Sequence, residues 1–73
     1  MVYAIVYAYG HDVENHGNRA DSVHRFPNVA QRTRFLHEQE AGGFQADAIK
    51  QSHPKVRKAL RAAAQGGDWP QLV

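Results

Sequence analysis

Two glycine pairs, Gly42–Gly43 and Gly66–Gly67, constrain the fold of this chain more than any other feature. Glycine readily adopts the left-handed backbone that ends many helices, so each pair predicts a helix C-terminus. The segment before the first pair begins after Pro27, which stops a strand, and Asn28 is a favourable N-cap. We therefore predict a helix over residues 29–41.

The segment before the second glycine pair predicts another helix. Ser52 is its predicted N-cap, and Pro54 falls in the first turn, where a missing N–H costs nothing. One side of this helix is an apolar stripe of Val56, Ala59, Leu60 and Ala63. The opposite side carries four cations, Lys55, Arg57, Lys58 and Arg61. This separation is typical of a surface helix that packs on a sheet through one side.

The N-terminal sequence VYAIVYAY, residues 2–9, is rich in β-branched and aromatic residues and predicts a strand. Both of its faces are apolar, which favours a strand that is covered on both sides, or on one side with the other held for a partner. The polar residues 10–18 predict a turn region, and residues 19–26 predict an antiparallel return strand. Residues 44–49 predict a third, short strand.

These elements predict one domain over residues 1–73, of the α+β class. We expect a small antiparallel sheet in the order ββαβα, with the two helices packed on one face. The bulky face of the first strand, with Tyr3, Ile5 and Tyr7, is the simplest surface for that packing. If the helices covered the small face instead, Tyr3 and Tyr7 would be exposed and available to a partner. Trp69 is expected to anchor the C-terminal tail.

Seventy-three residues without a cysteine exclude disulfides and thiolate zinc sites. A chain of this size needs an efficient core, self-association or a bound partner for stability. The apolar N-terminus is too short to span a bilayer, so we expect no membrane partner. The lack of cysteine is compatible with a cytoplasmic location.

The residues do not indicate catalysis or metal binding. No phosphate-binding glycine loop and no nucleophile elbow is present. Ser22 and Ser52 have histidines nearby in sequence, but we expect such neighbours not to meet in catalytic geometry. His11 and His16 share a loop with two carboxylates, without a recognised zinc spacing. We therefore expect a protein that is not an enzyme and holds neither a metal nor a cofactor.

The basic side of the second helix is the strongest indication of a partner. Residues 1–49 carry a net charge of −2 and residues 50–73 carry +4. The cations are compatible with a solvated helix surface, with contact to a phosphate backbone, or with contact to an acidic protein surface. Our candidate partner-binding residues are Lys55, Arg57, Lys58, Arg61, Tyr3 and Tyr7.

The sequence HRFPNVAQRTRFLHEQ, residues 24–39, with the short strand before it, resembles small proteins of phages and other mobile elements. The shared layout is an N-terminal hairpin, an aromatic residue and turn leading into a helix, and a basic C-terminal helix. The resemblance implies a protein that binds and blocks a host protein, as anti-CRISPR proteins do, in the host cytoplasm. These proteins share no motif, so no functional residue is carried over.

The leading functional hypothesis is thus a non-enzymatic, phage-encoded inhibitor of a bacterial protein or nucleoprotein complex, of the anti-CRISPR-like kind. A nucleic-acid-binding accessory protein that uses the basic helix is the second hypothesis. A structural or assembly protein that forms a homodimer through the first strand is the third.

Overall fold

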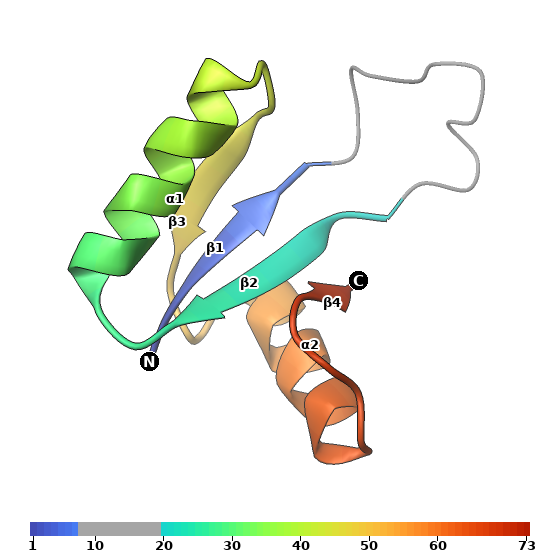
Figure 1. Ribbon diagram of the computed structural model, residues 1–73. Helices are drawn as coiled ribbons and strands as arrows, with labels where there is room; N and C mark the ends of the chain where they lie inside the picture. Colours follow the sequence, from blue (N-terminus) through green and yellow to red (C-terminus); the bar gives the residue numbers. More distant parts are fainter. Residues whose placement is uncertain (8–19) are drawn as a thin grey trace.

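The computed structural model describes residues 1–7 and 20–73 and contains a small sheet with two helices (Figure 1). The elements follow the order β1 (Val2–Val6), β2 (Ser22–Phe26), α1 (Val29–Ala41), β3 (Ala46–Ile49), α2 (Pro54–Ala64) and β4 (Gln71–Leu72). The predicted α+β class and ββαβα order are therefore confirmed, with one additional short strand at the C-terminal end.

The four strands are antiparallel throughout and lie in the order β3-β1-β2-β4. β1 is central: Ala4 lies opposite His24 of β2 on one side and Ala48 of β3 on the other. Both edges of β1 are therefore occupied within the chain. β1 therefore has no free edge among the described residues with which to pair with a second copy.

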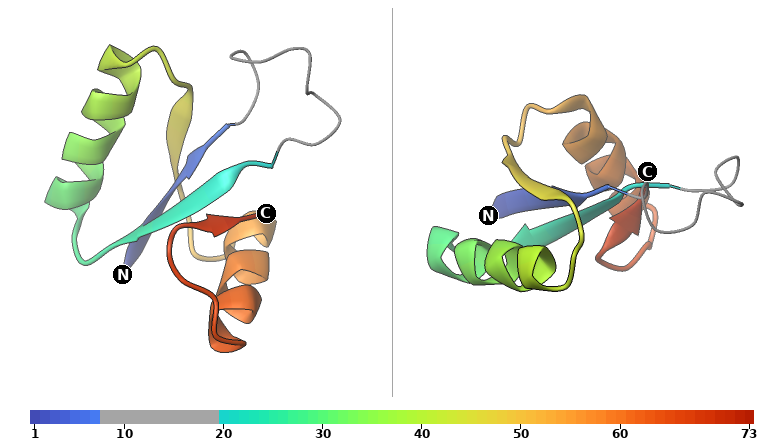
Figure 2. Two further views of the ribbon diagram at one scale, coloured as in Figure 1. Left: turned by 45° about the vertical axis from the view of Figure 1, so that its right-hand side comes forward. Right: turned by 90° about the horizontal axis from the view of Figure 1, so that it is seen from above.

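The two helices lie on opposite faces of the sheet, as Figure 2 shows in the view from above. The expectation that both pack on one face is thus wrong. α2 packs on the face of Tyr3 and Ile5, where Val56 joins their cluster. α1 covers the other face, where the Phe35 ring lies 4.6 Å from that of His24. Because both faces of β1 are apolar, each face needs a cover.

The core is small and lies mainly between the sheet and α2. Its buried apolar residues are Tyr3, Ala4, Ile5, Val23, Val56 and Ala59. In contrast, α1 has no buried residue. Its cover of the other face is formed by half-buried side chains, among them Phe35 and Leu36. α1 therefore has no fully buried side chain, whereas α2 has Val56 and Ala59.

The bounds of α1 agree with the prediction from the sequence. The Asn28 side-chain oxygen accepts a hydrogen bond of 2.9 Å from the backbone N–H of Gln31, which confirms the N-cap. Gly42 closes the helix, and Gly43 has the positive φ of 83°. The left-handed residue that a helix end commonly uses is therefore the second glycine of the pair.

The C-terminal tail folds back onto the sheet as expected. Trp69 packs against the core, with its ring centroid 6.1 Å from that of Tyr3. Beyond it, Gln71 pairs with Val23, and the N–H of Val73 donates a 2.8 Å hydrogen bond to the Asp21 carbonyl. The tail thus adds a strand that its sequence did not indicate.

The predicted strands are longer than the observed ones. Residues 20, 21, 44 and 45 of the second and third predicted strands lie outside the observed Ser22–Phe26 and Ala46–Ile49, and residue 19 lies outside the described residues. Residues 8 and 9 of the first predicted strand and the turn region 10–18 lie outside the described residues. Within the described part of the chain, no helix combines the length and the apolar character that crossing a membrane requires.

Candidate binding surface

α2 is fixed at its N-terminus by a different cap from the predicted one. His53, not Ser52, is the N-cap, and its Nδ1 accepts a 3.1 Å hydrogen bond from the N–H of Lys55. Pro54 is the first helical residue, as expected. The acceptor in this cap is an imidazole nitrogen, whereas N-caps more often use a hydroxyl such as that of serine. The sequence pattern therefore pointed to the neighbouring Ser52.

The predicted apolar stripe holds α2 against the sheet. Val56 and Ala59 are fully buried, while Leu60 and Ala63 are half-buried beside them. The helical period then turns the residues opposite this stripe toward solvent. The structure therefore confirms the division of α2 into an apolar and a basic side.

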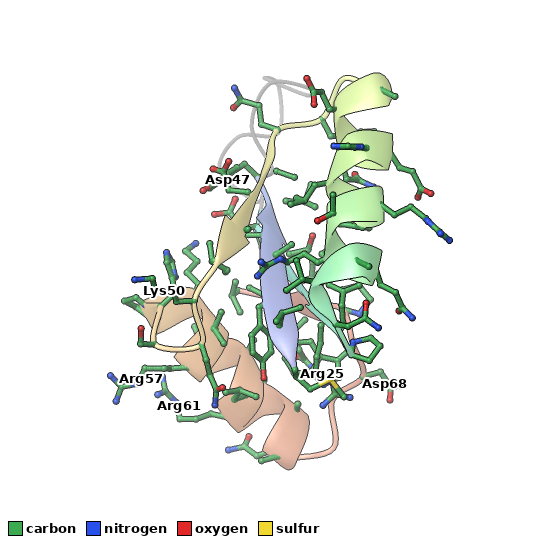
Figure 3. All side chains as sticks on the ribbon, turned by 90° about the vertical axis from the view of Figure 1, so that its left-hand side faces the viewer. Arg25, Asp47, Lys50, Arg57, Arg61 and Asp68 are labelled. Carbon is green, nitrogen blue, oxygen red and sulfur yellow. The ribbon has the colours of Figure 1, made fainter. Side chains whose placement is uncertain are left out.

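Three of the four predicted helix cations form what we call the basic surface, defined as Arg57, Lys58 and Arg61. All three are exposed, and α2 contains no acidic residue. Figure 3 shows Arg57 and Arg61 on the same side of the molecule, with Lys50 close above them. The basic surface thus carries positive charge that no acid of its own helix balances.

Lys55 does not belong to the basic surface. Its ammonium lies 3.0 Å from a carboxylate oxygen of Asp21, with side-chain exposures of 41% and 20%. The ion pair joins the first turn of α2 to the residue before β2. Partly exposed pairs of this kind contribute on the order of 1 kcal/mol or less. We therefore assign Lys55 to the fold rather than to the candidate contact.

The two predicted tyrosines have different environments. Tyr3 is 4% exposed and lies in the core, so its side chain cannot contact a partner. Tyr7 is half-buried, and its hydroxyl donates a 3.0 Å hydrogen bond to Asp47 of β3. The alternative with exposed tyrosines is therefore wrong for Tyr3, because α2 and Trp69 cover its side of β1.

An aromatic and cationic contact that the sequence did not indicate lies beside the basic surface. The Arg25 guanidinium is 4.8 Å from the centre of the Trp69 ring. The two residues border an open surface depression together with Leu60 and Asp68. They come from β2 and from the tail, so only the folded chain brings them together. The contact is a cation–π interaction that helps to hold the tail.

Ser22 and His24 do meet, contrary to the expectation from the sequence. The Ser22 hydroxyl lies 2.9 Å from His24 Nε2, because positions i and i+2 of a strand share one face. Burial beneath α1 lowers the pKa of His24 from its usual 6.5, which favours the neutral ring. Phe35 covers that ring, so we interpret the pair as a polar contact within the α1 layer.

The described residues contain no group of three or more histidine, aspartate or glutamate side chains arranged to hold a metal ion. The loop with His11 and His16, which supplied the donors considered from the sequence, lies outside the described residues. Ser52 is adjacent to His53, whose Nδ1 is already engaged as the cap.

Comparisons with models of known protein families, with curated proteins and with solved structures find no match to this chain. The functional argument therefore depends on the geometry and charge of the described residues.

Proposed function

We propose that this protein is a binding protein that docks its basic surface onto an acidic surface of a protein or nucleoprotein complex. The exposed, unbalanced cluster of Arg57, Lys58 and Arg61 is the observation that carries the proposal. A helix pinned to a sheet presents these side chains from a rigid base, which reduces the entropy lost on binding. Arginine also forms bidentate hydrogen bonds with carboxylates.

An acidic protein surface accounts for the basic surface better than a nucleic acid does. The cluster has only three cations, and no aromatic residue of α2 lies among them to stack on a base. The aromatic Trp69 is already engaged by Tyr3 and Arg25. Inhibition of a bacterial protein or nucleoprotein complex by a phage-encoded chain is the specific form of this proposal, in keeping with the resemblance of the sequence.

Charge reversal tests the proposal directly. Tagged wild-type protein and the variant Arg57→Glu/Lys58→Glu/Arg61→Glu are compared as baits in a nuclease-treated bacterial lysate. We expect a partner that the wild type retains and the triple variant loses, while both have the same circular dichroism. The control Arg34→Glu changes an exposed cation of α1, on the other face of the sheet, and should retain the partner. Equal retention by the triple variant would refute the assignment.

A salt titration separates a protein partner from a nucleic acid. Contact of the three cations with duplex DNA predicts a slope of about −2.7 for log K against log salt concentration. We expect no binding of duplex or single-stranded DNA in a gel shift at low salt. DNA binding with that salt dependence, present in the wild type and absent in the triple variant, would favour a nucleic-acid-binding accessory protein instead.

A further inference from the structure

β3 is an edge strand whose outward peptide groups have no strand partner among the described residues. Its only neighbour in the sheet is β1. The N–H of Tyr7 donates a 2.9 Å hydrogen bond to the Gln45 carbonyl, so alternate residues from Gln45 onward face β1. Asp47 and Ile49 therefore bond to β1, while Ala46 and Ala48 direct their N–H and C=O groups away from the sheet.

The charges beside β3 differ in sign between its two ends. An open depression of about 320 Å³ at the first end is lined by the carboxylates Glu40 and Asp47. Another of about 320 Å³ at the second end is lined by the cations Arg32 and Lys50. Figure 3 shows Asp47 and Lys50 at successive heights along this side of the molecule.

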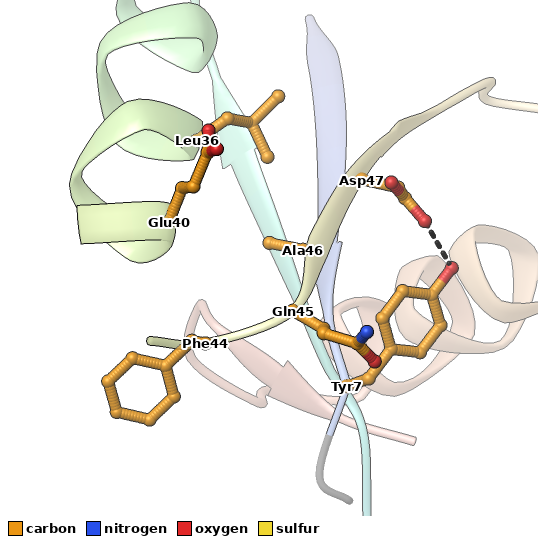
Figure 4. A pocket seen from close by; sticks show the side chains of 7 residues that line it. All are labelled: Tyr7, Leu36, Glu40, Phe44, Gln45, Ala46 and Asp47. Carbon is orange, nitrogen blue, oxygen red and sulfur yellow. Dashed lines mark hydrogen bonds between the residues drawn. The ribbon is translucent and has the colours of Figure 1, made fainter. Parts of the chain in front are cut away.

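The space between the charged ends is bordered by small and apolar side chains. Figure 4 shows Leu36 of α1 and Ala46 of β3 facing one another at the first depression. Ala48 is exposed further along the strand, and Leu36 is half-buried. A second strand can therefore approach this edge without a steric barrier from a bulky side chain of β3.

We propose that a second copy of this chain pairs antiparallel with the free edge of β3, forming a two-fold dimer with a continuous sheet of eight strands. A two-fold axis at Ala48 places the acidic end of each copy against the basic end of the other, so the edge is complementary to itself. Moving the two-fold axis by one residue, to Asp47, would shift the pairing by two residues and place the two Asp47 carboxylates opposite one another, which is unfavourable.

The small core also favours a second copy of the chain at the edge of β3. α1 contributes no buried residue, and Leu36 keeps part of its apolar surface exposed in the single chain. Dimerisation through β3 would cover part of this α1 layer and would add stabilisation to a cysteine-free chain of 73 residues. The basic surface remains free, because it lies on α2, opposite the apolar stripe that packs on the other face of the sheet.

Sedimentation velocity at rising protein concentration tests the dimer. We expect the average mass of the wild type to increase from 8.2 kDa toward twice that value. The variant Ala48→Pro should remain monomeric with an unchanged circular dichroism spectrum, since the N–H it removes is not used within the sheet. A wild type that stays monomeric at every concentration overturns the proposal and leaves an extended segment of another protein as the occupant of this edge.

A charge exchange provides a second test that does not depend on proline. Glu40→Lys and Lys50→Glu should each weaken the dimer, and the double variant should recover much of the lost affinity. Glu40 and Lys50 lie at opposite ends of the edge, so recovery requires two copies. Lys58→Glu makes the same charge change on the basic surface and should dimerise like the wild type. A dimer unaffected by both Ala48→Pro and the single reversals would show that another surface is used.

Discussion

Ile5, Val23 and Val56 are the largest fully buried side chains among the described residues, and they meet between β1, β2 and α2. Each comes from a different element, so their contact joins the three elements that form the core. In a core with so few buried residues, little neighbouring apolar volume is available to fill a cavity. Truncating one of these side chains should therefore lower the free energy of unfolding by about as much as truncation at other fully buried sites does.

Shortening Ile5 in two steps tests this expectation. Ile5→Val should lower the free energy of unfolding by about 0.5–1.5 kcal/mol, and Ile5→Ala by about 2–5 kcal/mol. Urea unfolding followed by circular dichroism measures both. The exposed Leu72 is the matched control, since Leu72→Ala should change stability by less than about 0.5 kcal/mol. Equal costs for the two Ile5 variants would show that the site relaxes instead of leaving a cavity.

His24 predicts a pH dependence of stability. Burial lowers its pKa in the folded chain below the usual 6.5, so the unfolded chain binds a proton more readily. The contribution of His24 to stability is fully present above pH 6.5 and is lost as the pH falls through its lowered folded pKa. Thermal unfolding at a series of pH values should show this decrease. His24→Gln should flatten the profile in this range, and an unchanged profile would contradict the assignment to His24.

α1 contacts the sheet through half-buried side chains. It has no buried residue, and its main ring contacts are those of Phe35 with His24 and Phe26, at 4.6 and 5.0 Å. Arg32 adds a 3.3 Å hydrogen bond to the Tyr3 carbonyl. Because α1 has no fully buried side chain, local signals at its ends should contribute measurably to its stability.

Substitutions at the N-cap of α1 test whether its end signals stabilise the helix. Asn28→Ala removes the acceptor for the Gln31 N–H and should lower the free energy of unfolding by about 0.5–2 kcal/mol. Asn28→Asp keeps an acceptor oxygen and should retain most of that stability. Hydrogen exchange should locate the loss in the first turn of α1. A loss spread evenly over the chain would contradict a local contribution of this cap to α1.

The C-terminal tail closes the molecule by connecting α2 back to β2. Trp69 lies against Tyr3 and under the Arg25 guanidinium, and β4 pairs with β2 beyond it. The Lys55–Asp21 ion pair joins the other end of α2 to the residue before that strand. α2 is therefore held at both ends, which keeps the basic surface in a fixed orientation.

Trp69→Ala should weaken the packing of the C-terminal tail against the sheet. We expect a loss of about 2–3 kcal/mol in the free energy of unfolding, below the ~3–5 kcal/mol for a fully buried tryptophan because Trp69 is half-buried. Trp69→Phe keeps an aromatic ring and should restore part of the loss. Urea unfolding provides the measurement. An unchanged midpoint for Trp69→Ala would show that the tail does not contribute to the cooperative fold.

The sequence by itself determined the features that depend on neighbours along the chain. Asn28 and the first glycine pair set the bounds of α1, because caps and left-handed turns act over a few residues. The period of Val56 and Ala59 determined the buried side of α2 for the same reason. The exposed part of the candidate site, Arg57, Lys58 and Arg61, followed from that periodicity alone.

Only the tertiary structure decided which surfaces meet. The apolar character of both faces of β1 did not specify which helix covers which face, and the helices lie on opposite ones. The partner of Lys55 is Asp21, 34 residues away in the chain, so no local pattern separated this cation from the basic surface. The pairing of β4 and the free edge of β3 likewise depend on contacts between distant segments, which spacing along a sequence does not encode.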